Sequence, residues 1–294
     1  MVDYKRCGND IFLKDKNFKL EHTFECGQCF RYEKIDENNY YTILRDRILY
    51  LEEIDGGILL KNVKDEELEY IFDYFDLNTN YDKIKEILSD GDENLEKAIK
   101  EKWGIHLLKQ DLFETYISFI ISQSNQIPRI RSNIKAISKK YGKRMYDEKI
   151  GEYYLFPTKE ELSKATEEEL RDLKLGYRAE YIVIATKYFI ENNLTYEYFE
   201  KLSYEESIKE LIKIKGIGLK VANCIALFSL KKVDAFPVDT WVIKLISALY
   251  LKREAKKKEV ENFVNEKFKI YGGYAQQYLF YYARDNKISI KNKE

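Results

Sequence analysis

The stretch that decides the fold reads Leu211-Ile-Lys-Ile-Lys-Gly-Ile-Gly-Leu-Lys-Val-Ala-Asn-Cys-Ile-Ala226. Its two glycines, Gly216 and Gly218, permit positive φ and a close approach of the backbone, and they separate two segments of helical character. Several N–H groups at the start of the second segment can then point outward together and bind a phosphate. The stretch predicts two helices joined by a phosphate-binding turn. A glycine-terminated helix and a plain turn would explain the glycines alone equally well.

The chain beyond this hairpin adds a second signal, Ala235-Phe-Pro-Val-Asp-Thr-Trp-Val242. Pro237 favours extended backbone, and Asp239 is a natural N-cap for a helix that begins with the apolar residues Val242, Ile243 and Ile246. On this pattern alone, Asp239 would need no role beyond capping the helix.

The combination of Gly-Ile-Gly, Lys220 on the next turn and Pro-Val-Asp 19 residues later resembles the helix-hairpin-helix family of DNA glycosylases. A lysine at this place marks the bifunctional members. The resemblance therefore implies that Lys220 attacks the sugar C1′ and forms a Schiff base, and that Asp239 orients it and stabilises the positive charge on the sugar. It also implies a monovalent or divalent cation, held at the hairpin by three backbone carbonyls, those of Ile212, Ile214 and Ile217.

Two further segments are similar to the 8-oxoguanine branch of that family. The stretch Phe24-Glu-Cys-Gly-Gln-Cys-Phe-Arg-Tyr32 matches its Gly-Gln-x-Phe-Arg-Trp pattern, which implies that the Gly27 carbonyl accepts the N7–H that only the oxidised base carries. The stretch Gly272–Phe280 looks like its C-terminal helix. The base pocket implied by the resemblance comprises Gly27, Phe119, Cys224, Gln276 and Phe280. The ordinary alternatives are a turn at Gly27 and an aromatic helix in the core.

Another pair of segments, 124–129 and 175–179, is similar to the places where relatives contact the strand opposite the lesion. The resemblance implies that Tyr177 is a wedge and that Arg129 and Arg178 read the orphaned cytosine. Ser124 stands where Asn is expected, with Asn125 beside it, so the residue that fills the vacated stack is open. Gly216 and Gly218 would meet phosphate. Trp241 replaces a histidine that touches phosphate in many eukaryotic relatives, so that contact is lost or moved.

The remaining pattern predicts an α+β fold. Two β-rich stretches, 41–51 and 58–60, are joined by the turn signal Asp55-Gly56-Gly57, and helical spacing begins near Tyr81. We expect helices over 112–121 and 179–190, a helix ended by Gly176, and one with Pro128 in its first turn and a buried stripe of Ile127, Ile130, Ile134 and Ile137. The predicted domains are an N-terminal antiparallel β-sheet domain (1–100) and an all-helical glycosylase domain (101–294).

Charge and composition limit the partners. Residues 211–294 carry 17 Lys and Arg against 8 Asp and Glu, a net of +9, which leaves −10 for the first 210 residues. The split favours a polyanion partner for the C-terminal part, although the run 252–258 taken alone is more typical of a solvated helix face. No apolar run reaches the roughly 20 residues of a membrane span, and the start lacks a secretory signal, so we expect a cytoplasmic protein.

Cysteine and histidine are too few for a metal centre. The Cys26-x-x-Cys29 pair has no second pair, the chain contains 2 histidines, and the C-terminal tail lacks the cysteines of an iron–sulfur cluster. The resemblance thus implies a monomeric DNA glycosylase/lyase that excises 8-oxoguanine from duplex DNA without a required cofactor. One alternative is an alkylbase DNA glycosylase, which uses the Asp without a lysine. The other is a non-catalytic helix-hairpin-helix DNA-binding protein.

Overall fold

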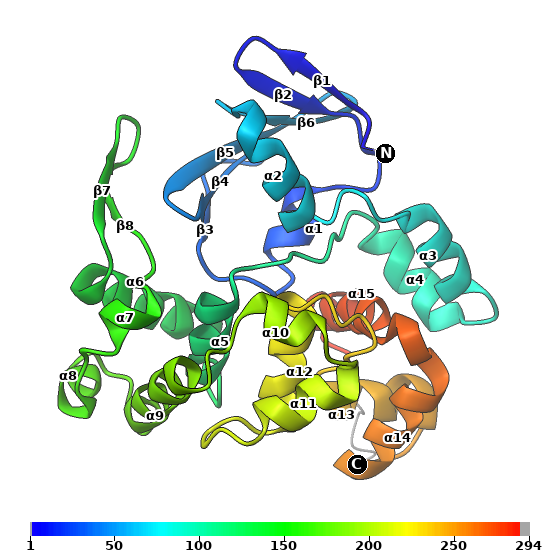
Figure 1. Ribbon diagram of the computed structural model, residues 1–294. Coiled ribbons are helices and arrows are strands. Elements are labelled where there is room, and N and C mark those ends of the chain that lie inside the picture. Colours follow the sequence, from blue (N-terminus) through cyan, green and yellow to red (C-terminus); the bar gives the residue numbers. More distant parts are fainter. Residues whose placement is uncertain (1, 289–294) are drawn as a thin grey trace. The chain divides into compact units, whose positions relative to one another are not determined.

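An antiparallel sheet of six strands forms the N-terminal part of the protein, in a computed structural model that describes residues 2–288. Its strands are ordered β1-β2-β6-β5-β4-β3 (Figure 1). Their bounds are β1 Tyr4–Cys7, β2 Asp10–Leu13, β3 Tyr32–Lys34, β4 Asn39–Leu44, β5 Arg47–Ile54 and β6 Gly57–Leu60. In the pairing of β2 with β6, Ile11 lies opposite Leu60 and Leu13 opposite Ile58, and all four side chains are buried. This face of the sheet therefore belongs to the core.

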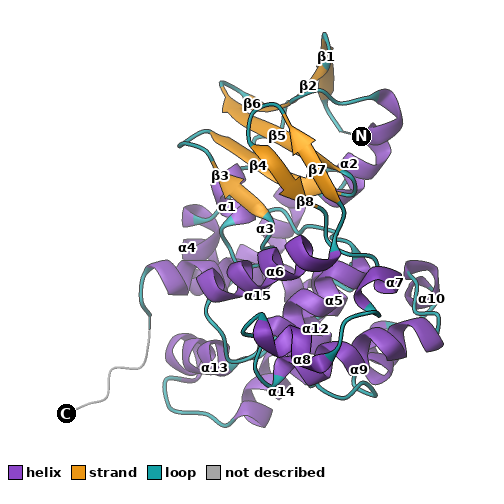
Figure 2. Ribbon diagram, turned by 90° about the vertical axis from the view of Figure 1, so that its left-hand side faces the viewer, coloured by secondary structure: helices purple, strands orange, loops and turns teal. Residues whose placement is uncertain are grey.

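Helices make up most of the remaining structure, which confirms the predicted α+β class (Figure 2). Before the long helical region come α1 Leu20–Phe24, α2 Leu68–Tyr74, α3 Tyr81–Ser89 and α4 Glu93–Glu101. The long helical region begins with α5 Leu112–Ile121, α6 Ile127–Tyr141, α7 Lys159–Leu162, α8 Glu167–Asp172, α9 Arg178–Glu191, α10 Tyr196–Glu200, α11 Tyr204–Leu211 and α12 Leu219–Phe228. The last are α13 Thr240–Ile246, α14 Lys257–Phe268 and α15 Gly272–Asp285.

The described residues group into two compact units. The first contains residues 2–28, 52–109 and 231–288, and the second contains 29–51 and 110–230. Within the first unit α15 packs on α4, and within the second α12 packs on α5 and α11. The predicted domain division near residue 100 remains a prediction.

Three local expectations need correction. The stretch 41–51 is two strands, because Arg45 takes a left-handed φ of 48° and turns the chain between β4 and β5. The α8 helix ends at Asp172, since Lys174 is already left-handed (φ 64°), and Gly176 (φ 60°) lies in the following turn. Ile127 is 37% exposed because it occupies the first position of α6, whereas the rest of its stripe is buried.

The helical region is not all-helical. Strands β7 Arg144–Asp147 and β8 Gly151–Tyr154 pair antiparallel within it. Among residues 2–288, none of the helices combines the length and the apolar character that crossing a membrane requires.

The stability of the first unit should depend on the protonation of His22. The side chain is buried, and Gly104 N donates to its Nδ1 at 3.1 Å, which requires an unprotonated nitrogen. Burial, helped by the charges of Lys19 and Lys102, lowers the pKa of His22 from 6.5 to about 4. The unfolded state thus takes up the proton first, so stability is complete above pH 6.5 and falls as the pH decreases towards 4.

The measurement is the melting temperature across this pH range for the wild type and for His22→Asn. The variant should lose less stability on acidification, because it has no proton to take up at this position. Equal slopes for the two proteins would contradict the assignment.

Candidate active site

The turn between α11 and α12 is built around Gly216. Its φ is 94°, and a Cβ at this position would lie 2.5 Å from Cγ of Tyr181 in α9. Gln123 Nε2 donates to the Gly216 carbonyl at 2.9 Å, which holds the turn against the loop that follows α5. The predicted pair of helices joined by a glycine turn is confirmed, and no residue other than glycine fits the turn.

An open pocket of about 420 Å³ lies at this turn. It is lined by Gln123, Tyr181 and every residue from Ile212 to Gly218, which includes the three residues predicted to offer carbonyls. The Ile214 carbonyl also accepts the Ile217 amide at 3.0 Å. No side chain caps α12 at Gly218, so the amides of its first turn are left for a ligand. The pocket thus lies at the hairpin turn, directly before the first turn of α12.

Lys220 is the second residue of α12, and its side chain is half-buried. The ammonium nitrogen lies 5.5 Å from the ring centroid of Phe119 in α5. That ring is itself fixed by a stacked contact with Phe228 and an edge contact with Phe30. Cys224 lies one turn further along α12 and is buried. The second unit therefore brings Lys220, Phe119 and Cys224 to one region.

Asp239 is the N-cap of α13. Its Oδ1 accepts from Val242 N at 2.8 Å, which confirms the capping role. Its Oδ2 makes no hydrogen bond within the described part of the first unit. Lys220 and Asp239 belong to different units, and their pairing remains a prediction.

The predicted base-reading residues of the first unit are Gly27, Gln276 and Phe280. Gly27 has a φ of 89°, and a Cβ added there would lie 3.7 Å from Phe280 Cε1. Gly27 therefore lies in a turn that needs positive φ, and it also lies close to Phe280 of α15. Gln276 is buried, and its Oε1 accepts from Gln277 Nε2 at 2.7 Å. Sequence reasoning missed Gln277, because adjacent residues of a helix do not normally face each other.

The residues predicted to contact the opposite strand surround Gln123. Its backbone carbonyl accepts from Arg178 Nε at 2.9 Å and from the Tyr177 hydroxyl at 3.2 Å. Arg178 also donates to the Ser124 carbonyl at 3.0 Å and is only 6% exposed. Tyr177, in contrast, is 46% exposed. Arg178 fixes the loop in this structure, and its contact with a base remains a prediction.

The other members of this group lie at the surface of the second unit. Ser124 is exposed and left-handed (φ 47°), whereas Asn125 is half-buried and donates to the Ile121 carbonyl at 3.1 Å. Arg129 is exposed and donates to the Lys174 carbonyl at 3.3 Å. The surface leaves open which of Ser124 and Asn125 would enter a base stack.

Trp241 lies at a second pocket, of about 340 Å³, in the first unit. The pocket is also lined by Thr240, Lys244 and Lys287. The indole carries no charge, but two lysines line the same pocket. Positive charge is therefore present where Trp241 replaces the expected histidine.

No group of three or more His, Cys, Asp and Glu side chains suited to a metal ion occurs among residues 2–288. The Cys26 thiol donates to the Thr23 carbonyl at 3.2 Å, and burial raises its pKa to about 12. In this structure Cys26 is therefore a buried thiol that is hydrogen-bonded to its own loop.

Two models of known protein families match parts of the chain. The 8-oxoguanine DNA glycosylase N-terminal domain matches residues 10–116, and the HhH-GPD superfamily of base excision DNA repair proteins matches residues 117–269. The Clostridium acetobutylicum 8-oxoguanine glycosylase/lyase, solved with double-stranded DNA containing cytosine opposite 8-oxoguanine, superposes with a TM-score of 0.92 at 39% identity. That comparison covers 98% of this chain and 99% of the other.

Two curated proteins are similar over most of the sequence. The N-glycosylase/DNA lyase OGG1 of Arabidopsis thaliana is 29% identical, over 91% of this chain and 78% of its own length. The N-glycosylase/DNA lyase of Saccharomyces cerevisiae is 30% identical, over 79% of this chain and 68% of its own length.

The structural role of Arg178 can be tested against Arg129. Arg178→Ala should lower the free energy of unfolding by about 1 to 3 kcal/mol, because it removes a charged donor from the carbonyls of Gln123, Ser124 and Leu175. Arg129→Ala is the control, since its exposed side chain makes one long bond, and should change that energy by less than about 0.5 kcal/mol. Denaturant titration measures both. Equal losses would mean that the Arg178 contacts do not stabilise the fold.

Proposed function

Because the chain belongs to the HhH-GPD superfamily of base excision DNA repair proteins and carries the 8-oxoguanine DNA glycosylase N-terminal domain, we propose Lys220 as its nucleophile and Asp239 as the assisting carboxylate. The protein is a DNA glycosylase/lyase that binds double-stranded DNA and excises 8-oxoguanine. The observation that carries the residue assignment is the position of Lys220 on the first turn of α12, beside the phosphate-binding turn and the Phe119 ring.

In the proposed reaction, the neutral Lys220 amine forms a bond to C1′ while the C1′–N9 bond breaks and the electron pair leaves with the base. Opening of the sugar ring gives an imine between Nζ and C1′. Loss of a proton from C2′ then expels the 3′ phosphate by β-elimination. The positive charge that develops on the sugar is the feature that a nearby carboxylate would stabilise.

Asp239 fits that electrostatic role because its capping bond fixes the carboxylate. Oδ1 is held by the Val242 amide, and Oδ2 is left to face the sugar. A preorganised charge of this kind costs no reorientation when the transition state forms.

The base pocket that we propose combines Gly27, Phe119, Cys224, Gln276 and Phe280. A base removed from the stack needs flat or soft walls and polar partners for its edge. The aromatic rings and the thiol would supply the walls, and the Gln276 amide would read the Watson–Crick edge. The Gly27 carbonyl would accept the N7–H, which distinguishes 8-oxoguanine from guanine by one hydrogen bond.

We further propose that the hairpin meets a phosphate through Gly216 and Gly218 and holds a monovalent or divalent cation through Ile212, Ile214 and Ile217. Backbone carbonyls are suitable ligands for such hard cations, and all three residues line the 420 Å³ pocket. On the opposite strand, Tyr177 would be the wedge, Arg129 and Arg178 would read cytosine, and Ser124 or Asn125 would fill the vacated stack. A monomer acting in the cytoplasm on nucleoid DNA, without a required cofactor, remains our expectation.

The two alternatives differ in what they require. An alkylbase glycosylase uses the carboxylate alone and would have no use for an amine at Lys220. A non-catalytic helix-hairpin-helix protein would need neither Asp239 nor the Gln276 amide. Borohydride trapping on an 8-oxoguanine duplex distinguishes the proposed enzyme from both alternatives, because only a lysine imine can be reduced to a covalent adduct.

Lys220→Gln should reduce excision and borohydride trapping to background while binding of the lesion duplex persists. Asp239→Asn should fold normally, since Asn also caps helices, and should excise about 100-fold or more slowly because the negative charge is gone. Single-turnover kinetics on an 8-oxoguanine duplex measure both. Trapping by Lys220→Gln would place the nucleophile elsewhere, and an unchanged rate in Asp239→Asn would leave Asp239 as a helix cap only.

Gln276→Ala should reduce excision of 8-oxoguanine but spare cleavage of a preformed abasic site, because the second substrate has no base to hold. The comparison of the two substrates in one preparation is its own control for folding. Equal losses on both would assign Gln276 to the packing of α15 instead of to base recognition.

A further inference from the structure

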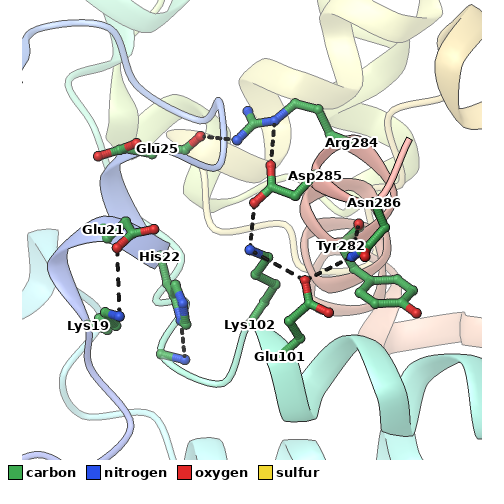
Figure 3. A network of polar contacts seen from close by, with 11 residues as sticks. Lys19, Glu21, His22, Glu25, Glu101, Lys102, Tyr282, Arg284, Asp285 and Asn286 are labelled. Atoms are coloured by element: carbon green, nitrogen blue, oxygen red, sulfur yellow. Dashed lines mark hydrogen bonds and ion pairs between the residues drawn. The ribbon is translucent and has the colours of Figure 1, made fainter. Parts of the chain in front are cut away.

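Arg284 connects the loop that contains Gly27 to the helix that carries Phe280. It lies on the last turn of α15, one turn after Phe280, so both side chains lie on the same side of the helix. Arg284 Nη2 donates to the Glu25 carbonyl at 2.8 Å, two residues before Gly27 (Figure 3). A Cβ at Gly27 would lie 3.7 Å from Phe280 Cε1 and 4.0 Å from Arg284 Nη1. The loop that contains Gly27 therefore lies against both Phe280 and Arg284.

The chain after Gly27 is held by a different set of contacts. Gln28 is fully buried, and its Nε2 donates to the carbonyls of Thr23 and His106, while its Oε1 accepts from Leu108 N. These bonds fix the loop on the C-terminal side of Gly27. The Arg284 bond acts on its N-terminal side.

The guanidinium is itself positioned by Tyr281 and Asp285, and Lys102 contacts both of these residues. Its carbon lies 4.6 Å from the ring centroid of Tyr281, and its Nε lies 3.4 Å from Asp285 Oδ1. Asp285 Oδ2 is 2.6 Å from the ammonium of Lys102, whose side chain is 9% exposed and lies 4.2 Å from the same Tyr281 ring. Figure 3 shows this chain of contacts from Lys102 through Asp285 and Arg284 to Glu25. A charged network that is partly removed from water is stiffer than an exposed pair.

We propose that Arg284 is a specificity-determining positioning residue, which holds the Gly27 carbonyl at the place where it accepts the N7–H of 8-oxoguanine. The inference rests on the proposed role of Gly27 as the lesion sensor. Hydrogen bonds weaken steeply with distance and angle, and this discrimination depends on one such bond. A loop released at Glu25 would keep its fold through Gln28 but lose the position of the carbonyl.

The test uses Arg284→Met, which keeps an apolar stem against Tyr281 and removes the donor. In the Lys220→Gln background, binding of an 8-oxoguanine:cytosine duplex is compared with that of a guanine:cytosine duplex. The preference for the lesion should fall by roughly tenfold, as expected for one hydrogen bond. With Lys220 intact, excision of 8-oxoguanine should fall similarly, whereas cleavage of a preformed abasic site should not change.

Arg253→Met is the matched control, because Arg253 makes an exposed ion pair with Glu259 in the same unit. It should keep the wild-type preference. Arg284→Lys retains the charge without the planar fork and should recover only part of the preference.

The outcomes separate the two hypotheses. A wild-type protein without preference for the lesion duplex would contradict the proposed function itself. A selective wild type with an equally selective Arg284→Met would overturn the role of Arg284. Equal losses of excision and of abasic-site cleavage would also overturn it, since they would indicate a general effect on the fold.

Discussion

The close approach of the Gly216 backbone to the Tyr181 ring is the contact on which the second unit depends. It leaves no room for a side chain at the turn, and therefore sets where α12 begins and where Lys220 stands. The same turn accepts the Gln123 side chain, while the Gln123 backbone carbonyl accepts Arg178 and Tyr177. One residue outside the hairpin thus links the hairpin turn to the residues that we propose for the opposite strand. A displacement of the turn would therefore also displace Arg178 and Tyr177, and the reverse holds as well.

The first unit uses ordinary structural groups for the proposed chemistry. Asp239 caps α13 with one carboxylate oxygen, and we propose that the other faces the sugar. Gly27 makes a turn that needs positive φ, and the same turn brings the loop to Phe280. In both cases one residue serves the fold and is also suited to the proposed function, so a structural role and a catalytic role do not exclude each other.

Residue spacing predicted the parts of the site that are local in sequence. The hairpin, Lys220 on its second helix and Asp239 as an N-cap all follow from patterns within about 30 residues. Gln123, Gln277 and Arg284 were not predicted, because their roles depend on side-chain contacts that periodicity does not encode; Arg284 reaches across 259 positions to Glu25. The turn at Arg45 was missed for a related reason, since arginine carries no turn signal and its left-handed backbone is imposed by the sheet.

The burial of Cys26 has a consequence for the conditions in which such an enzyme works. Its substrate is guanine oxidised at C8, so the protein acts where peroxide and related oxidants are present. These reagents attack thiolates, and a thiol whose pKa is raised to about 12 supplies almost none at neutral pH. The residue next to the proposed lesion sensor is thus a poor nucleophile towards peroxide. The loop that carries the proposed sensor therefore reacts slowly with this class of oxidant at its own cysteine.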